Sequence, residues 1–477
     1  MLILNNMLNF NIIVAYCKNR GIGLNNTLPW SLKKEMKHFR DITTNKELCN
    51  LVIMGRNTWE SIPDNFKPLK NRINVIITSR KYTHDLENNT YYFKSLNESL
   101  LFEYNKIINP DGVFVIGGTM LYNEAIKHES CRRLYITEIY QNFECDTFFP
   151  EINKSFKLSN VSSFQEDNSV YFRYLDYHKD SSDTWRNLEE EQYLNTLKEI
   201  LDDGIERNDR TNVGTLSVFG KSFKYNLRDT FPILTTKRVF FRAVFEELML
   251  YLRGQTNNNI LNDKGIHIWD GNTSRDFLDK RGLNNYDVGD MGETYGFNFR
   301  HFGGEYHGYD KNYENQGFDQ LNYVIKLIKN NPTSRRIMIS LWNPKTLHKA
   351  ALPSCLCQYQ FYVDTIKKEL NLQIYIRSSD FFLANNWNTC TGALFVHLLC
   401  NINGLDLTPG ILTVVTGDTH IYSNHTEQAK INLERTPTPF PKLVVKKNCD
   451  KIEDFEFTDI SLVGYSPMPN IKANMAV

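Results

Sequence analysis

Val113-Phe114-Val115-Ile116-Gly117-Gly118 is the stretch that best indicates the fold of the first third of the chain. Four apolar residues, mostly β-branched, predict a buried strand, and the paired glycines let the backbone approach a ligand closely. A helical pattern over Met120–Lys127 follows at once, and a helix N-terminus favours a phosphate. An ordinary tight turn explains a double glycine equally well, so this stretch alone assigns no site.

The same alternation of short strands and helices extends on both sides of this stretch. A helix is predicted over Leu32–Ile42, and the further strand candidates are Ile12–Tyr16, Leu51–Met54, Val75–Thr78 and Leu134–Ile139. Strand–helix alternation predicts a mainly parallel α/β sheet, whose ligands collect at the carboxyl ends of the strands. Gly55-Arg56-Asn57-Thr58 forms a second strand-to-helix turn of this kind.

One domain boundary stands out. Strand-like sequence over Val170–Leu175 is followed by the polar stretch His178–Thr184, and helical spacing resumes over Trp185–Leu201. A polar stretch between two periodic segments is typical of a linker. We therefore expect one domain over residues 1–178, a short linker over 179–185 and a second domain over 186–477.

Composition narrows the class of protein. The 477 residues include 41% hydrophobic and 13% aromatic side chains, enough for real cores, and the formal net charge is zero, so no polyanion-binding surface or nucleic-acid partner is implied. Nine irregularly spaced cysteines argue against a disulfide framework and for a reducing compartment. No apolar run approaches the length of a membrane span. We expect a soluble cytoplasmic protein, and no motif predicts a metal site.

Glu35 is the most specific residue of the first domain. Ser31 is a plausible N-cap for the helix that follows, and Leu32, Glu35, Met36 and Phe39 then fall on one face. A lone carboxylate on an apolar stripe is costly unless it binds a polar group or has a raised pKa. It therefore suits a group that holds and helps to protonate a polar ring. A glutamate at the edge of the stripe, reaching solvent, is the alternative.

The second domain has the residues that a phosphorylated substrate needs. Guanidinium groups make bidentate contacts to phosphate, and Arg210, Arg335, Arg336 and Arg377 with Ser378 supply such a set. Neighbours on a strand point to opposite faces, so Arg335 and Arg336 cannot easily enter one pocket, and one of them could reach a partner subunit. Isolated Arg pairs are usually surface residues, so the inference depends on the whole set.

A cysteine nucleophile is the second feature of this domain. Cys355 follows Leu352-Pro353-Ser354 and precedes the strand-like Tyr359–Val363. Nearby arginines favour the thiolate, which is the nucleophilic form. Cys357 is a rival two residues later, and these local features do not decide between the two.

Residues 9–178 resemble the dihydrofolate reductase family from end to end. The stretches that carry the resemblance are Ile13–Ala15, Gly21–Gly23, Leu28–Trp30, Leu51–Trp59, Pro68–Arg72 and Asp146–Pro150. The resemblance implies a mixed sheet with flanking helices and an enzyme that reduces dihydrofolate with NADPH. Met36 stands where many members of the family have an aromatic residue.

The resemblance also implies roles for individual residues. Glu35 would be the pterin-binding acid with Thr137 behind it, Arg72 would take the folate α-carboxylate, and Met36 and Phe39 would flank the pterin and benzoyl groups. Arg56 and Arg80 could pair with the ribose phosphate that distinguishes NADPH from NADH. The complete set expected to bind NADPH is Ala15, Gly21, Ile22, Gly55, Arg56, Thr58, Ser79, Arg80, Gly117 and Gly118.

Residues 186–477 resemble the thymidylate synthase family. The matching stretches are Thr235–Phe240, Ile268–Asp270, Asn298–Gly303, Ser334–Arg336, Pro439–Leu443 and Met475–Val477. In that family the nucleophile lies five residues before the Gln of a Gln-Phe-Tyr-Val run, which selects Cys355 over Cys357 because that Gln is Gln360. A reductase followed by a synthase in one chain resembles the bifunctional enzymes of protists and of some large DNA viruses.

This second resemblance implies a methyl transfer. Cys355 would attack C6 of dUMP, and C5 would take the methylene of the co-substrate 5,10-methylenetetrahydrofolate. The folate would then give up a hydride and leave as dihydrofolate. Glu247, Trp269, Tyr295 and Asp380 would organise folate, water and proton transfer. Asn388 would read the uracil edge, since an amide both donates and accepts. The residues expected to bind dUMP are Arg210, Arg335, Arg336, Gln360, Arg377, Ser378, Asn388, His420 and Tyr422, in a homodimer formed through this domain.

The chain departs from the family at the centre of this site. Leu356 follows the nucleophile where the family usually has His, and Leu383–Cys390 rebuilds the segment around Asn388. Leu356 offers no hydrogen bond, so we expect Asn386 and the indole N–H of Trp387 to hold replacement waters near Glu247 and Asn388. Two alternatives to an active synthase are therefore a nucleotide hydroxymethylase, in which water ends the reaction, and a dimerisation or RNA-binding module without catalysis. Retention of Cys355, the arginines and Asn388 argues against the second alternative.

Overall fold

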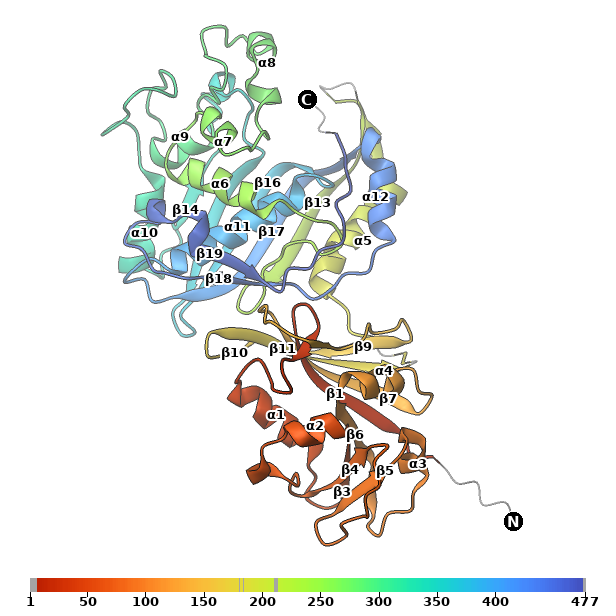
Figure 1. Cartoon of the computed structure of the whole chain (residues 1–477). Helices are drawn as coiled ribbons and strands as arrows, with labels where there is room; N and C mark the ends of the chain where they lie inside the picture. The colour runs from red at the N-terminus through yellow and green to blue at the C-terminus, as the bar shows by residue number, and fades with distance from the viewer. Residues whose placement is uncertain (1–6, 180, 183, 210–212, 475–477) are drawn as a thin grey trace. The chain divides into compact units, whose positions relative to one another are not determined.

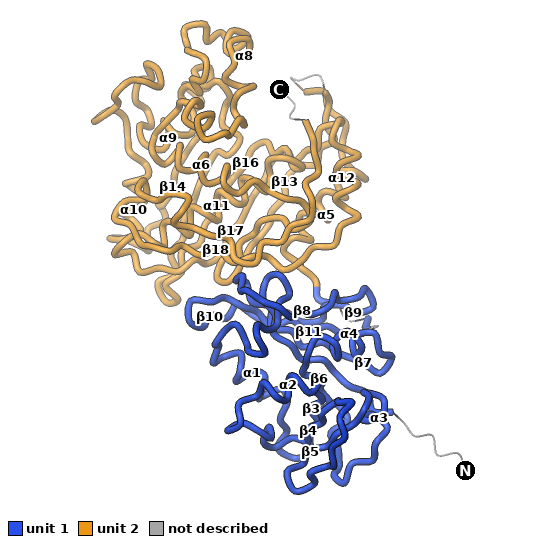
Figure 2. Tube along the Cα trace, in the orientation of Figure 1, with its two compact units in different colours: residues 1–185 blue, residues 186–477 orange. Residues whose placement is uncertain are grey.

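The structure is a computed structural model that describes residues 7–179, 181–182, 184–209 and 213–474. The chain folds as two units, Met1–Trp185 and Arg186–Val477 (Figure 2). No helix within the described residues is long and apolar enough to cross a membrane. No disulfide is present among the described cysteines.

A mixed sheet forms the centre of the first unit (Figure 1). Its strand order is β10-β11-β7-β1-β6-β3-β4-β5, and β9 pairs with β11. The pairs from β7 through β5 are parallel, whereas β9, β10 and β11 pair antiparallel. The strands are β1 (Phe10–Cys17), β3 (Cys49–Gly55), β4 (Arg72–Ile77), β5 (Thr90–Phe93), β6 (Ile108–Gly117), β7 (Cys131–Ile139), β9 (Phe156–Val161), β10 (Gln165–Asp167) and β11 (Val170–Lys179).

The parallel strands are buried because helices cover the sheet. Ile12, Leu51, Val75, Val115 and Leu134 have no exposed surface, as expected for strands covered on both faces. The helices are α1 (Lys33–Thr43), α2 (Arg56–Ser61), η1 (Asp64–Phe66), α3 (Leu96–Leu101) and α4 (Thr119–Ala125), and the short strands β2 (Gly21–Gly23) and β8 (Thr147–Phe148) pair with each other. The predicted strand–helix alternation is confirmed, with shifts of a few residues at the element ends.

Two local predictions were wrong. Ser31 does not cap α1, because Leu32 occupies the N-cap position without a side-chain bond, and the amide of Lys34 donates to Asp167 Oδ2 at 2.9 Å. The cap therefore comes from the end of β10, far along the chain. The last strand does not end at Leu175 but continues to Lys179, because β9 pairs with its final residues.

A six-stranded sheet of order β12-β13-β17-β16-β15-β14 organises the second unit. Neighbouring strands are antiparallel except for the parallel pair β16 and β17. The strands are β12 (Ile205–Arg207), β13 (Thr215–Asn226), β14 (Met338–Ser340), β15 (Leu356–Asp364), β16 (Glu369–Asp380) and β17 (Thr408–Tyr422), with β18 (Lys442–Val445) and β19 (Ile460–Val463) forming a separate hairpin-like pair.

Two apolar helices, α6 and α11, form the centre of the helical layer on this sheet (Figure 1). Alternate residues of β16, including Leu372, Ile374 and Ile376, are buried beneath this layer, whereas Gln373 and Tyr375 face away and are exposed. The helices are α5 (Leu188–Asp203), α6 (Phe241–Leu252), α7 (Asn259–Asn262), α8 (Arg275–Lys280), α9 (Tyr295–Arg300), α10 (Gln320–Asn330), α11 (Asn385–Cys400) and α12 (Thr426–Leu433), with short 3₁₀ turns η2 (Gly271–Thr273), η3 (Leu347–Lys349), η4 (Ser423–His425), η5 (Ile452–Asp454) and η6 (Phe457–Asp459).

The first helix of this unit begins later than its apolar spacing predicts. The pattern starts at Trp185, but α5 starts at Leu188 because the side chain of Asn187 accepts from the amide of Glu190 and caps it. Glu190 is fully buried, and its carboxylate accepts from the amides and hydroxyls of Thr235 and Thr236. These bonds fix the segment that leads into α6.

Candidate functional sites

A buried carboxyl group marks the first candidate site. Glu35 lies in the first turn of α1 and is only 6% exposed. Burial raises its pKa to about 7, and a hydrogen bond with the side chain of Thr137 lowers it in part. Thr137 is opposite Ala15 in the β1–β7 register, so the β-sheet fixes the wall behind the carboxyl group. A carboxyl group with this pKa can bind a cationic ring and can hold a proton near neutral pH.

Met36 and Phe39, which are also predicted to bind folate, lie on α1, and Arg72 on β4 contacts that helix. Met36 is half exposed on that helix, and the guanidinium carbon of Arg72 lies 5.8 Å from the centre of the Phe39 ring. Arg72 Nη1 donates to Thr43 Oγ1 at 2.7 Å, and burial lowers its pKa to about 10. The buried indole nitrogen of Trp30 has no hydrogen-bond partner among the described residues, so a polar donor is left for a ligand or a water.

The glycines at the carboxyl ends of β3 and β6 fit a bound dinucleotide. Gly117 has a φ of 141°, and a Cβ there would lie 3.0 Å from Thr58 Oγ1, so only glycine leaves this backbone accessible. Ser79 and Arg80 are exposed in the loop after β4, and Arg56 Nη1 contacts the carboxylate of Glu60 at 2.8 Å. Gly55 ends β3 beside them, while Gly21 and Ile22 lie on β2 and Gly118 precedes α4.

The second candidate site is built around the loop that carries Cys355. The amide of Cys355 donates to the hydroxyl of Tyr295 at 2.8 Å. Arg377 on β16 donates from Nε to the carbonyl of Ser354 at 2.9 Å and from Nη2 to that of Pro353 at 3.1 Å. The sequence predicts Arg377 only as a phosphate ligand, whereas the structure also gives it the task of holding the loop before the nucleophile.

Glu247 on α6 is buried in the same region and accepts three side-chain hydrogen bonds. Tyr251 and Trp269 donate to Oε1 at 2.8 Å each, and Trp387 donates to Oε2 at 2.7 Å. Desolvation raises the pKa of Glu247, and these three donors oppose that rise. The sequence analysis assigned no role to Tyr251, and it expected Trp387 to hold waters near Glu247 rather than to bond the carboxylate directly.

The parallel pair β16 and β17 brings together several predicted nucleotide-binding residues. Ser378 is opposite Asp418, and Asp380 is opposite His420. His420 Nδ1 lies 2.9 Å from Asp418 Oδ1, which lowers the pKa of that aspartate, and its ring meets the Tyr422 ring edge-on at 5.3 Å.

Asn388 lies in the first turn of α11, and its amide makes no side-chain hydrogen bond among the described residues, so both of its polar atoms are available to a base. Asp380 Oδ1 accepts from the amide of Leu383, which leads into α11. The carboxylate of Asp380 thus positions the segment that presents Asn388.

Three other residues predicted to bind dUMP lie on or beside the edge of the six-stranded sheet. Arg335 and Arg336 are exposed ahead of the edge strand β14, and Gln360 on β15 pairs with Met338 and Gln373. Arg210 lies outside the described residues.

Comparison with known proteins identifies both halves. The family model for dihydrofolate reductase matches residues 9–179, and that for thymidylate synthase matches residues 191–477. A bifunctional dihydrofolate reductase-thymidylate synthase of Paramecium tetraurelia is 40% identical, covering 98% of this chain and 99% of its own length. The chain belongs to the bifunctional dihydrofolate reductase–thymidylate synthase family. The proteins of that name from Zea mays and Leishmania major are each 38% identical over 98% of this chain and 97% and 95% of their own lengths.

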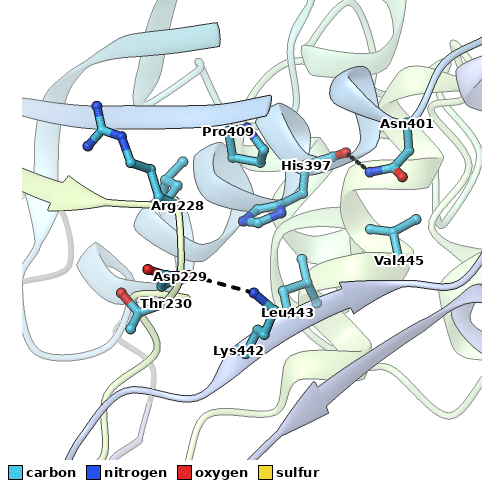
Figure 3. Close-up of a pocket in the computed structure, with 10 residues that line it drawn as sticks. Arg228, Asp229, Thr230, His397, Asn401, Pro409, Lys442, Leu443 and Val445 are labelled. Atoms are coloured by element: carbon cyan, nitrogen blue, oxygen red, sulfur yellow. Dashed lines mark hydrogen bonds and ion pairs between the residues drawn. The ribbon is translucent and has the colours of Figure 1, made fainter. Parts of the chain in front are cut away.

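The second unit also contains a cavity outside the candidate sites. This small cavity of about 160 Å³ lies between the end of β13 and α11. Figure 3 shows residues that line it, among them Arg228, His397 and Lys442. None of its lining residues belongs to a predicted site, and Asp229 contacts Lys442 across it at 3.9 Å. No cluster of metal-ligating side chains occurs in the part of the chain that the structure describes.

Proposed function

We propose that the two sites divide one cycle of folate chemistry between them. The chain methylates dUMP with 5,10-methylenetetrahydrofolate and reduces the dihydrofolate so formed with NADPH. The synthase site lies around Cys355 in the second unit, and the reductase site lies around Glu35 in the first. The observation that best supports this assignment is the loop before Cys355, because Arg377 and Tyr295 both hold it in place for attack on a ligand.

Each residue of the synthase site acts on a stated part of the reaction. The Cys355 thiolate adds to C6 of dUMP, and C5 then attacks the methylene carbon of the folate and loses its proton. The bond between the methylene carbon and the folate breaks, a hydride from the folate reduces the methylene to a methyl group, and the thiolate leaves C6, which releases dTMP and dihydrofolate. Asn388 holds the uracil edge, and Arg377 with Ser378 binds the phosphate. Glu247 transfers protons at the uracil ring. It is buried, and hydrogen bonds hold both oxygens of its carboxylate in place.

The reductase site needs one proton at the pterin. Glu35, whose pKa is about 7, binds the pterin ring and supports protonation at N5. NADPH supplies the hydride when bound. Arg72 is placed to take the folate carboxylate, and Thr58 with Gly117 forms the surface against which the dinucleotide lies.

A second copy of the chain completes the synthase site in this proposal. The face of β15 and β16 that points away from the helical layer carries Tyr362 and Tyr375, which are 68% and 38% exposed. Arg335 and Arg336 lie exposed at the edge of the same sheet. A homodimer formed through this face would bury the tyrosines and bring an arginine to the neighbouring phosphate site.

One pair of variants tests the synthase assignment. With 5-³H-dUMP and methylenetetrahydrofolate, the wild-type chain should release tritium and form dTMP, identified by mass. Cys355→Ser should abolish release while NADPH oxidation against dihydrofolate is unchanged. The matched variant Cys357→Ser should retain both activities, because burial raises the pKa of that thiol. A product with a hydroxymethyl group would show the alternative reaction instead.

A further inference from the structure

Trp387 contributes a contact to the synthase site that no motif predicts. It lies in the first turn of α11, next to Asn388, and its indole nitrogen is 2.7 Å from Glu247 Oε2 on α6. Tyr251 and Trp269 both donate to the other oxygen, Oε1. Among the described side chains, Trp387 is therefore the one donor to Oε2.

The residue after the nucleophile cannot make this contact. Leu356 is 2% exposed, belongs to the same apolar core and has no polar side-chain atom. The sequence analysis expects Asn386 and Trp387 to hold waters near Glu247 in place of the histidine that the family usually has after the nucleophile. In the structure, the indole N–H of Trp387 on α11 instead donates directly to the carboxylate of Glu247 on α6.

We propose that Trp387 is a positioning residue of the synthase reaction: its indole N–H fixes Oε2 of Glu247, and so orients that carboxylate for proton transfer at the uracil ring. This inference rests on the synthase function proposed above. An indole N–H donates but neither accepts nor titrates, so it holds the carboxylate without competing for its proton. Because Asn388 is the next residue, one helical turn positions both the base-reading amide and the proton-transfer group.

Two tyrosine side chains link the bond between Trp387 and Glu247 to the loop that carries Cys355. The Tyr251 and Tyr295 rings stack with their centres 4.8 Å apart, and the Tyr295 hydroxyl accepts from the amide of Cys355. A carboxylate displaced from Trp387 would therefore disturb groups that touch the Cys355 loop. The titratable groups that face Glu247 are Tyr251, Tyr295 and Tyr359, all buried phenols with raised pKa values, so none supplies a positive charge.

Trp387→Phe removes the N–H and keeps an aromatic ring. We expect kcat for tritium release at pH 7 to fall by about tenfold or more, with KM for dUMP changed less than about twofold. Loss of a donor to the ionised carboxylate raises the pKa of Glu247, so the acid limb of kcat against pH should move to higher pH. A fall in kcat without movement of that limb would contradict the proposal, since loss of packing alone does not move it.

Two further variants separate the N–H from the fold. Replacing the indole of residue 387 by benzothiophene, which has sulfur in place of N–H and nearly the same shape, should reproduce the effect of Trp387→Phe. Thr391→Val, which removes a hydroxyl bond to the Trp387 carbonyl but leaves the indole, should keep the wild-type profile. If the wild-type chain releases no tritium, the proposed function fails. If it does, and the benzothiophene chain matches it in kcat and pH profile, only this inference fails.

Discussion

At the scale of single residues, Glu35 is held in a place where its charge opposes folding. Burial raises its pKa from an ordinary 4.5 to about 7, so the folded chain binds this proton more tightly than the unfolded chain. The contribution of Glu35 to stability is therefore most favourable below pH 4.5, is lost as pH rises between 4.5 and 7, and stays unfavourable above 7. The difference is on the order of 3 kcal/mol.

Glu35→Gln should remove this penalty. The variant should be more stable than the wild type at pH 8 by about 2 kcal/mol or more and show no such gain at pH 4, while reductase kcat at pH 7 falls by about a hundredfold. Urea titration of the full chain, followed by hydrogen exchange in β1 and β7 peptides, measures the first effect, and NADPH oxidation measures the second. Equal stability of the two chains at pH 8 would show that Glu35 is not held with a raised pKa.

Leu356 is one of the positions at which the sequence analysis finds a departure from the family. A histidine there would enter a core position that is 2% exposed, where Trp387 already supplies the donor to Glu247. We expect Leu356→His to leave synthase kcat unchanged or lower, because the added imidazole needs a buried partner that the site does not offer. Tritium-release kinetics measure this directly, and a several-fold rise in kcat would mean that leucine merely damages the site.

At the scale of elements, the N-terminus of α1 depends on the end of the distant strand β10. Asp167 accepts from the Lys34 amide at 2.9 Å, one residue before Glu35. Asp167→Ala should destabilise the helix start by about 1 kcal/mol and lower reductase kcat/KM several-fold, since the acid moves with its helix. The neighbouring Glu166→Ala, at an exposed position of β10, is the control. Urea unfolding and steady-state kinetics compare the two, and equal effects would exclude a specific cap.

The elements that sequence periodicity could predict are those whose residues carry their own pattern. The apolar runs at Leu51–Met54 and Val113–Ile116 became β3 and β6 because strands buried on both faces need continuous apolar sequence. The cap of α1 could not be predicted, because Ser31 is the better local candidate and Asp167 is close only after folding.

In the candidate sites too, some features follow from the sequence and others exist only in the folded chain. Glu35 was predicted from its place on an apolar stripe, which is a local property, whereas Cys355 was selected over Cys357 through the spacing to Gln360 that the resemblance to the family implies. The bond between Trp387 and Glu247 joins residues 140 positions apart, and the contacts of Arg377 with Pro353 and Ser354 join two strands through a loop. Partners of this kind depend on packing and on sheet register, which periodicity does not report.

At the scale of the whole molecule, the proposed homodimer predicts complementation. A Cys355→Ser chain and a chain with Arg335→Ala and Arg336→Ala should each lack synthase activity. After verified subunit exchange, mixed dimers contain one site with an intact Cys355 and intact arginines, so activity should return to a substantial fraction of the wild-type value. Tritium release from the mixture, with each variant alone as the control, measures this. No recovery would show that each site is built from one chain.

The connection between β11 and α5 has a consequence for metabolism. Because one chain carries both units, every cell that makes it contains the two catalysts in a ratio of one to one, whatever the level of expression. Supply and demand for dihydrofolate cannot then be adjusted through the abundance of either enzyme. The balance is set by the turnover of the two sites alone, so a mutation that speeds the synthase is useful only up to the rate at which the reductase regenerates its folate.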